Sequence, residues 1–451
     1  MLRGKVLLLL TACSVSDADE PRCPVPALPA SDSCAPVFAT AAGRPCTRGA
    51  FTSLCVDPPM RPVDRDAFDD AWWAASARIV RVQIIGGELF VVPSRRNANC
   101  TATVKAWGML RHTLGQIRQS AQVAPLPDVD LLLTTGDESP AWPILSYNNP
   151  PGRSARTFLI PTHVGVGNSP KRRASGTACE RPTPAELEHW ARKLDPLVFR
   201  GSATGPTVDT NRWMANTRAR LSVLSKMFPS WIDASITRFE QAVPANETRA
   251  LSKFMAMGGR IPMNHFKYYK FIMDIDGNVQ ANRFPELTRF GSVVLQATRF
   301  ETVLTASAHR FAHVFPIAPD LRDLLPTLYC LRARPMLLVQ RLKHGIDVAR
   351  ELVTEPNVVQ RYWADLLQTY RALQRFPTVK HPAAISAKRF AYRPVRTHGV
   401  AGSTVDGRSR AQRPSSCAYE FYARDVEWAN GLWPLGKNGQ LGRDRPPADS
   451  R

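Results

Sequence analysis

The sequence predicts an α/β protein built from two units. From about residue 67 onward, apolar segments of strand length alternate with segments of helical periodicity, which is typical of parallel sheets covered on both faces. The chain has 451 residues, which is too long for a single hydrophobic core. Three of the predicted strands end in polar loops, and open α/β sheets bind their ligands at such strand ends.

We divide the chain into six parts on these patterns. They are a signal segment at 1–16, a Cys/Pro-rich extension at 17–66, an N-terminal unit at 67–182, a C-terminal unit at 183–352, a terminal helix at 353–376 that packs back across both units, and a basic, mostly disordered tail at 377–451.

The N-terminal unit opens with a predicted hairpin. The run "ARIVRVQIIGGELFVVP" at 77–93 places two strands on either side of Gly86 and Gly87. A helix is expected within 104–121, because its apolar residues recur at helical spacing. The run "DVDLLLTTGDESP" at 128–140 then predicts a continuous apolar strand that ends in a polar loop.

The C-terminal unit begins with a predicted helix at 183–194, in which Thr183 and Glu186 form a capping box. Strands are expected within "PLVFRGSATG", "KYYKFIMDIDGN" and "GSVVLQ". Helices are expected within "NTRARLSVLSKMF", "DLRDLLPTLYCL" and "NVVQRYWADLLQTYRALQ". We therefore expect a second strand-and-helix unit with polar loops after two of its strands.

The net charge of +21 favours anionic partners, but the basic residues are spread along the chain. The sequence contains no nucleic-acid module signature, so we expect no nucleic-acid partner. No apolar run reaches the length of a transmembrane helix. Diffuse charge of this kind indicates solubility rather than a dedicated polyanion site.

The first residues, "MLRGKVLLLLTACSVSDADEP", have the basic and apolar regions of a secretory signal. The run "LTAC" also resembles a bacterial lipoprotein box with Cys13 as the modified residue, which we keep as an alternative. Eight further cysteines agree with export, and the clustering of the first four predicts a disulfide-stapled extension. They are Cys23, Cys34, Cys46, Cys55, Cys100, Cys179, Cys330 and Cys417.

Several motifs occur in the order found in the family 90 glycosyltransferases, which include capsule-associated proteins and protein O-glucosyl- and O-xylosyltransferases. They are "PDVDLLLTTGDESP" with "PILSYNNPPG", "FRGSATG", "LSVLSKMFPSWIDASIT", "YYKFIMDIDGNVQANRF", "GSVVL", "AHVFPIAPDLRDL" and "YWADLLQTY". The sequence resembles this family from about Ala67 to Leu373.

The resemblance implies a GT-B fold, in which two Rossmann-like domains face each other across a cleft. It also implies inverting transfer of a sugar, glucose or xylose, from a UDP-sugar to a hydroxyl of a protein or glycan acceptor. The family needs no metal ion, so no cofactor is expected beyond the UDP-sugar donor. The expected location is the lumen of the endoplasmic reticulum or Golgi, or outside the cell.

The resemblance also assigns roles to individual residues. Asp137 in "TTGDE" falls on the catalytic aspartate, and Glu301 falls near the family's acidic residue at the nucleotide. The UDP-sugar contacts fall on Ser202, Arg218, Asn278, Val279, Gln280, Ala281, Asn282 and Arg283. Ala281 departs from the family, which usually has a small hydroxyl residue there.

Elementary chemistry supports these roles. An inverting transfer needs a base for the acceptor hydroxyl, and a carboxylate on a strand-end loop can supply it. The charge of the departing UDP must be met by arginines, backbone N–H groups or a helix N-terminus when no metal is used. Arg218 and Arg283 fit this need.

Alternatives remain open from the sequence alone. A metal-dependent GT-A transferase would use an Asp-x-Asp motif, and both Asp128-Val129-Asp130 and Asp274-Ile275-Asp276 have this spelling. A catalytically inactive secretory protein could keep the fold and bind a glycan or a nucleotide sugar. His309 and His313 have the spacing of metal ligands on a helix, but no third ligand is evident, so we expect a structural role.

Overall fold

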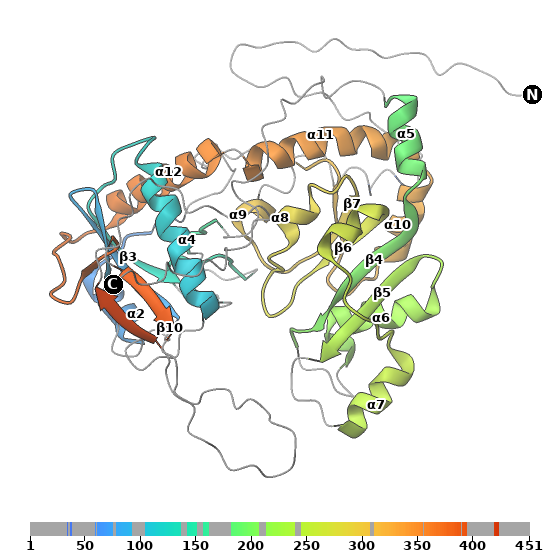
Figure 1. Cartoon of the computed structure of the whole chain (residues 1–451), viewed down its shortest axis with the longest axis horizontal. Coiled ribbons are helices and arrows are strands. Elements are labelled where there is room, and N and C mark those ends of the chain that lie inside the picture. Colours follow the sequence, from blue (N-terminus) through green and yellow to red (C-terminus); the bar gives the residue numbers. More distant parts are fainter. Residues whose placement is uncertain are drawn as a thin grey trace, which may run out of the picture.

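The computed structural model describes two units that lie side by side (Figure 1). The described residues are 34, 37, 59, 61–74, 78–92, 104–136, 142–150, 157–161, 182–206, 213–239, 245–306, 311–354, 356–388, 390–394 and 419–423. Each unit is built around one sheet, and the helices α11 (Pro335–Thr354) and α12 (Pro356–Leu373) run along one side of both units.

The N-terminal sheet has the strand order β3-β1-β2-β9. Its strands are β1 (Ile79–Ile85), β2 (Glu88–Val92), β3 (Val129–Thr134) and β9 (Ile385–Ser386). The predicted hairpin is confirmed, because β1 and β2 pair across Gly86 and Gly87, which both adopt a positive φ. All pairs among these four strands are antiparallel.

The expectation of a parallel sheet in this unit is therefore wrong for its named strands. In the part of this unit that the structure describes, parallel pairing occurs as isolated bridges, between Val63 and Gln374, between Leu133 and Leu145, and between Ser146 and Leu159. The strand β3 is buried along its whole length. A continuous apolar run therefore indicates that both faces of a strand are covered, but it does not indicate whether the strand pairs in parallel or antiparallel.

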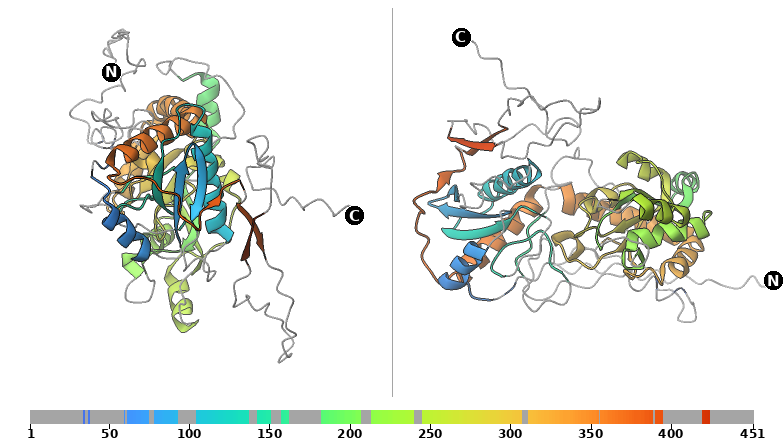
Figure 2. Two further views of the ribbon diagram at one scale, coloured as in Figure 1. Left: turned by 90° about the vertical axis from the view of Figure 1, so that its left-hand side faces the viewer. Right: turned by 90° about the horizontal axis from the view of Figure 1, so that it is seen from below.

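Three of the described helices pack on the N-terminal sheet. The helices α4 (Val104–Ser120) and α12 pack against each other, and the Trp363 indole N–H donates to Gln116 Oε1 at 3.0 Å. The shorter helix α2 (Arg65–Ala74) buries Phe68 and Trp72. Figure 2 shows these helices on the N-terminal sheet from two further directions. The predicted terminal helix is thus confirmed as a helix that packs on the N-terminal unit.

The C-terminal sheet has the order β5-β4-β6-β7-β8, and all of its pairs are parallel. Its strands are β4 (Leu194–Ala203), β5 (Ile232–Phe239), β6 (Tyr269–Ile275), β7 (Val293–Ala297) and β8 (Val314–Pro316). The chain passes from β4 outward to β5 and then returns to the other side of β4 as β6. The carboxyl ends of β4 and β6 therefore form the topological switch point of a doubly wound sheet.

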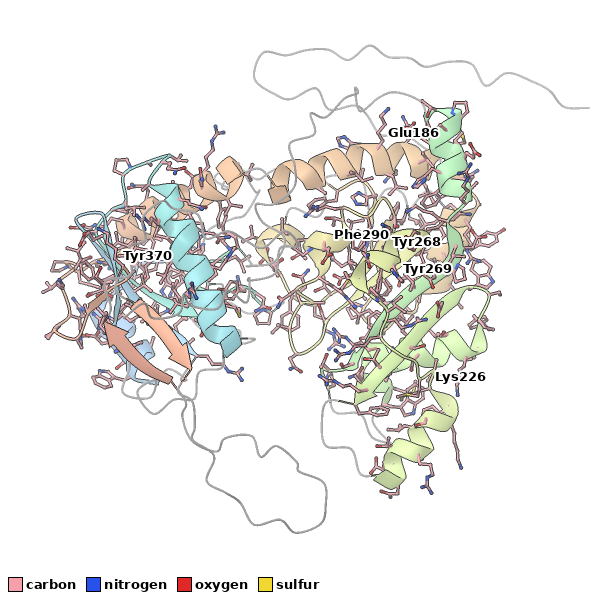
Figure 3. The ribbon with its side chains drawn as sticks, in the orientation of Figure 1. Glu186, Lys226, Tyr268, Tyr269, Phe290 and Tyr370 are labelled. Carbon is pink, nitrogen blue, oxygen red and sulfur yellow. A yellow bond between two sulfur atoms is a disulfide. The ribbon has the colours of Figure 1, made fainter. Side chains whose placement is uncertain are left out.

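Helices and short helical turns connect these strands. They are α5 (Pro184–Ala191), η1 (Trp213–Ala215), α6 (Thr217–Met227), α7 (Ala245–Phe254), η2 (Met263–Tyr268), α8 (Phe284–Leu287), α9 (Val303–Ala306) and α10 (Leu324–Arg332). The capping box predicted at the start of α5 is confirmed: Thr183 accepts from the Glu186 N–H, and Glu186, labelled in Figure 3, accepts from the Thr183 N–H.

Two findings concern the chain ends. Cys34 of the extension pairs with Cys330, so the described disulfide ties the extension to α10. Residues 377–388, assigned to a disordered tail, are ordered, and their strand β9 adds to the edge of the N-terminal sheet. A hairpin of β10 (Phe390–Pro394) and β11 (Tyr419–Ala423) follows.

The remaining cysteines and the signal segment lie outside the described residues. Among the described helices, none has the length and apolar character needed to cross a membrane.

A buried ion pair joins β1 and β3 inside the N-terminal sheet, and a neighbouring glutamine links the sheet to the segment after α12. Arg81 donates to both oxygens of Asp130, at 2.8 and 2.6 Å, and Asp130 is fully buried. Gln83 adds a third hydrogen bond to Asp130 and also bonds the backbone at Val379. Tyr370 of α12 lies in the same unit (Figure 3), and burial raises the pKa of its hydroxyl.

We predict that Asp130→Asn lowers the free energy of unfolding by about 3–5 kcal/mol, because it leaves the Arg81 charge buried without its counter-ion. Chemical denaturation measures this change. The matched control is Asp195→Asn, which breaks an exposed pair with Lys270 and should cost only about 0–1 kcal/mol. Equal effects of the two variants would contradict a structural role for the buried pair.

Candidate functional site

A pocket of about 350 Å³ opens at the switch point of the C-terminal sheet. Three strand-end loops line it together with the start of α6, which is the position where doubly wound sheets bind ligands. The lining residues are 204–206 after β4, 276–278 after β6, Ala297, Arg299 and Phe300 after β7, Asn216 and Thr217 at α6, and Pro319.

Arg218 holds the first two of these loops together. Its guanidinium donates to the backbone oxygens of Ser202, Ile275 and Asp276 at 2.8–2.9 Å, and to Thr204 Oγ1 at 2.7 Å. Burial lowers its pKa to about 9, so it remains charged at neutral pH. Four of its five N–H donors are therefore used by the protein. Arg218 does not line the pocket itself but holds in place the loops that form its wall.

The loops after β4 and β6 also approach each other through two glycines. A Cβ at Gly277 would lie 2.6 Å from Thr204 Oγ1 and 3.1 Å from an Arg218 nitrogen. Gly205 has φ +108°, and a Cβ there would lie 3.0 Å from the Gly277 oxygen. The Gly205 N–H donates to Asn278 Oδ1 at 3.1 Å. These loops can meet only because neither glycine carries a side chain.

The N-terminus of α6 points into the same pocket. Its N-cap, Asn216, accepts from the N–H groups of Arg218 and Ala219 at 3.1 Å each, and donates to the backbone oxygens of Thr204 and Pro206. Asn216 therefore fixes the helix start against the loop after β4. The partial positive charge of a helix N-terminus favours an anionic ligand group at this position.

Arg283 lies beneath the pocket and faces a buried carboxylate. Its NH1 group donates to the Arg200 oxygen at 2.8 Å, and its Nε lies 3.7 Å from Asp274 Oδ1. The guanidinium also stacks over the Phe199 ring at 4.7 Å. Its Nε and NH2 groups have no hydrogen-bond partner among the described residues. Arg283 thus keeps hydrogen-bonding capacity that the surrounding protein does not use.

Two carboxylates border these arginines. Burial raises the pKa of Asp274, although Arg283 opposes the shift and Gln296 Nε2 donates to its Oδ2 at 3.1 Å. Burial also raises the pKa of Asp276 to about 6, against hydrogen bonds from Thr298 Oγ1 at 2.7 Å and the Arg299 N–H at 2.6 Å. Asp276 lines the pocket, so its charge is part of the site.

The other predicted contact residues divide into two groups. Ser202 and Asn278 take part in the pocket, the first through its backbone and the second as a lining residue. Val279 and Ala281 accept backbone hydrogen bonds inside the loop, and Gln280 is buried. Asn282 is half-buried in the same loop. The structure thus brings the predicted loop to the site but places only its first residues in the pocket wall.

Glu301 lies at the border between the two units. Its N–H and C=O groups exchange hydrogen bonds with the backbone of Asn149, and its carboxylate is close enough to Tyr362 to help raise the pKa of that hydroxyl, which burial raises most. Asp137, the predicted base, lies outside the described residues. The strand β3 ends at Thr134, three residues before it.

Some pocket residues were missed from the sequence. Asn216 could have been recognised as an N-cap, because it directly precedes a helix of typical composition. Arg299, Phe300 and Pro319 carry no local signal, since their position depends on which strands are neighbours in the sheet, and Asp276 was considered only as part of an Asp-x-Asp metal motif.

The motifs that suggested metal binding have structural partners. Asp128 accepts from the Gly86 N–H at 2.7 Å, and Asp130 pairs with Arg81. His313 is buried and bonds the Thr288 oxygen at 2.9 Å, and burial lowers its pKa to about 4. His309 lies outside the described residues. No group of three or more His, Cys, Asp or Glu suited to a metal occurs in the described part of the chain.

A parallel doubly wound sheet with a polar pocket at its switch point is typical of proteins that bind a nucleotide or a related anion. The chain belongs to glycosyl transferase family 90, whose family model matches residues 188–421, or 234 of 451 residues. The match contains all strands of the C-terminal sheet and the whole pocket.

Relatives from mammals are also similar to this chain. "Protein O-glucosyltransferase 3" of Rattus norvegicus and that of Mus musculus are each 26% identical over 271 residues, which cover 57% of this chain and 48% of the relative. The protein of the same name from Homo sapiens is 28% identical over 186 residues, covering 41% and 33%. The chain thus spans less than half of the length of these curated relatives.

The Asp276 carboxyl should make stability depend on pH. At pH values between about 6, the pKa of Asp276 in the folded state, and 3.8, its ordinary pKa, the folded state binds a proton that the unfolded state lacks. The free energy of unfolding should therefore increase as the pH falls through this range. Relative to Asp276→Asn, the wild type should gain up to about 3 kcal/mol between pH 7 and pH 4. Denaturation of both proteins across this range measures the difference, and a constant difference would contradict the raised pKa.

Proposed function

We propose that the protein is an inverting glycosyltransferase that moves glucose or xylose from a UDP-sugar to a hydroxyl of a protein or glycan acceptor. The observation that carries the proposal is the pocket at the ends of β4, β6 and β7, inside the region that matches the family model. In the corresponding GT-B-like arrangement, this pocket of the C-terminal unit would face the N-terminal unit.

The donor diphosphate would bind between the N-terminus of α6 and the loop after β6. Arg299 lines the pocket and is exposed, and Arg283 has two nitrogen atoms without a partner among the described residues. Arg299 can donate to phosphate oxygens, the buried nitrogens of Arg283 would add positive charge behind the loop, and the helix N-terminus adds backbone charge on the same side. These groups would stabilise the negative charge that develops on UDP as it leaves.

Asp137 would act as the general base on the acceptor. It would remove the proton of the acceptor hydroxyl as that oxygen attacks the anomeric carbon, and the bond from this carbon to the UDP oxygen would break on the opposite face. A carboxylate in this role contributes about 10² to 10⁴-fold. In the sequence Asp137 follows β3 of the N-terminal unit, so the proposed base would come from that unit, while the pocket belongs to the C-terminal unit.

The acceptor is proposed from the names of the relatives, which describe glucose transfer to proteins. A protein hydroxyl in the secretory pathway agrees with the disulfide between Cys34 and Cys330, because such bonds persist in oxidising compartments. A folded EGF-like domain is the first acceptor to test, with cell-surface glycan as the comparison.

The proposed reaction predicts UDP release when the protein is incubated with UDP-glucose or UDP-xylose in the presence of EDTA. A coupled assay for UDP measures it with and without the acceptor domain. Release that needs added manganese would contradict the metal-free reaction and favour a metal-dependent transferase. UDP binding without release for any donor would favour an inactive nucleotide-sugar-binding protein.

The matched variants for this assay are Asp137→Asn and Glu138→Gln. The first keeps the shape of the side chain but cannot accept a proton at neutral pH, so turnover should fall by about 10²-fold or more. Its UDP affinity should stay within a few-fold, because UDP binds to the other unit. If Glu138→Gln is the inactive variant instead, the base has been assigned to the wrong carboxylate.

The shape of the pocket predicts that Gly277→Ala weakens UDP binding by about tenfold or more. The added Cβ would collide with Thr204 Oγ1 and crowd Arg218, so the loops after β4 and β6 would have to separate. Calorimetric titration with UDP measures the affinity. Gly259→Ala is the control, because nothing lies within 4 Å of a Cβ at that position. Equal affinities in both variants would move the donor site away from these loops.

A further inference from the structure

The two units are joined by a pair of backbone hydrogen bonds beside the pocket. The Asn149 N–H donates to the Glu301 oxygen, and the Glu301 N–H donates to the Asn149 oxygen, both at 2.8 Å. Glu301 directly follows Phe300, which lines the pocket. In Figure 1, the helix α9 that comes next lies on the side of the C-terminal unit nearest the N-terminal unit.

The Asn149 side chain fixes the position of this bridge. Its Nδ2 donates to the Thr157 oxygen at 2.9 Å, and its Oδ1 accepts from the Thr157 N–H at 3.4 Å. Asn149 is 4% exposed, so these bonds are shielded from water. The Thr157 hydroxyl in turn donates to the Ile144 oxygen. One asparagine therefore connects the segments 142–150, 157–161 and 300–302.

On the N-terminal side, the same segment is bonded to β3. The Leu145 N–H donates to the Leu132 oxygen at 2.7 Å, and the Thr134 N–H donates to the Leu145 oxygen at 3.0 Å. Because β3 ends at Thr134, the strand that leads to Asp137 is connected through residues 145–149 to the wall of the pocket.

From this geometry we propose that Asn149 is a positioning residue for sugar transfer, which sets the distance and direction between the loop after β3 and the donor pocket. The inference rests on the proposed function. Single displacement requires the acceptor oxygen, the anomeric carbon and the departing UDP oxygen to be in line, with the base within hydrogen-bond reach of the acceptor hydroxyl. A displacement of about 1 Å can cost about 10²-fold in rate. Asn149 does not line the pocket, so it acts through the alignment of the two units.

The test compares Asn149→Ala with the wild type in three measurements: UDP affinity by calorimetry, turnover of UDP-glucose with an acceptor domain, and thermal stability. We expect kcat to fall about 10- to 100-fold, while the Kd for UDP changes less than about threefold. The control is Gln116→Ala, which also removes a buried side-chain amide. The Gln116 amide accepts a hydrogen bond from Trp363 where α4 contacts α12, away from the pair of bonds between Asn149 and Glu301. It should lower the melting temperature without a comparable loss of kcat.

A second variant tests the same contact between the units, the joint formed by Asn149, Thr157 and Glu301, with a smaller change. Thr157→Val keeps the shape of the side chain and removes the hydroxyl that bonds Ile144, so it should lower kcat in the same direction without loss of UDP affinity. If kcat in Asn149→Ala and Thr157→Val falls no more than in Gln116→Ala, the joint is only structural and the inference is wrong. If UDP affinity falls together with kcat, the joint shapes the pocket instead of aligning the units, which also overturns it. Absence of UDP binding in the wild type would instead contradict the proposed function.

Discussion

The pocket depends on the guanidinium of Arg218. A buried charge is tolerated only when its donors are satisfied, and Arg218 satisfies four of them on the loops after β4 and β6. These bonds hold Thr204 and Gly277 so close that only glycine fits at 277. The family resemblance assigns Arg218 to the nucleotide, whereas its geometry makes it the support of the loops that form the pocket.

Charge compensation explains how two arginines can lie so near each other. Arg283 lowers the pKa of Arg218, while Asp274 and Asp276 raise it, so the four side chains form a balanced buried cluster. Burial in turn raises the pKa of both carboxyls. A site of this kind can accept further negative charge, because Arg283 retains donors without partners among the described residues and burial disfavours the charged form of both carboxyls.

The residues of the site differ in how far the sequence could place them. The polar residues after a buried strand predicted a ligand-binding loop, and the family resemblance assigned Asn278 to Arg283 within it as one contact segment. In the structure Asn278 lines the pocket, whereas Gln280 is buried and Arg283 is half-buried away from the pocket wall. Which side chain of a loop faces a ligand depends on the turn it makes against neighbouring loops, and Arg299, which joins the pocket from β7, shows no pattern in sequence.

The sequence by itself determined the features that depend on neighbouring residues: the hairpin at Gly86, the capping box at Glu186, and the strands and helices with clear periodicity in the C-terminal unit. Hydrogen bonds of turns and caps span a few residues, so their signals are local. Only the tertiary structure decided the antiparallel pairing of the N-terminal sheet, the disulfide between Cys34 and Cys330, and the partners of Arg218. These contacts join segments that are far apart in the chain, up to 296 residues for the disulfide, and local propensity carries no information about which distant segments will meet.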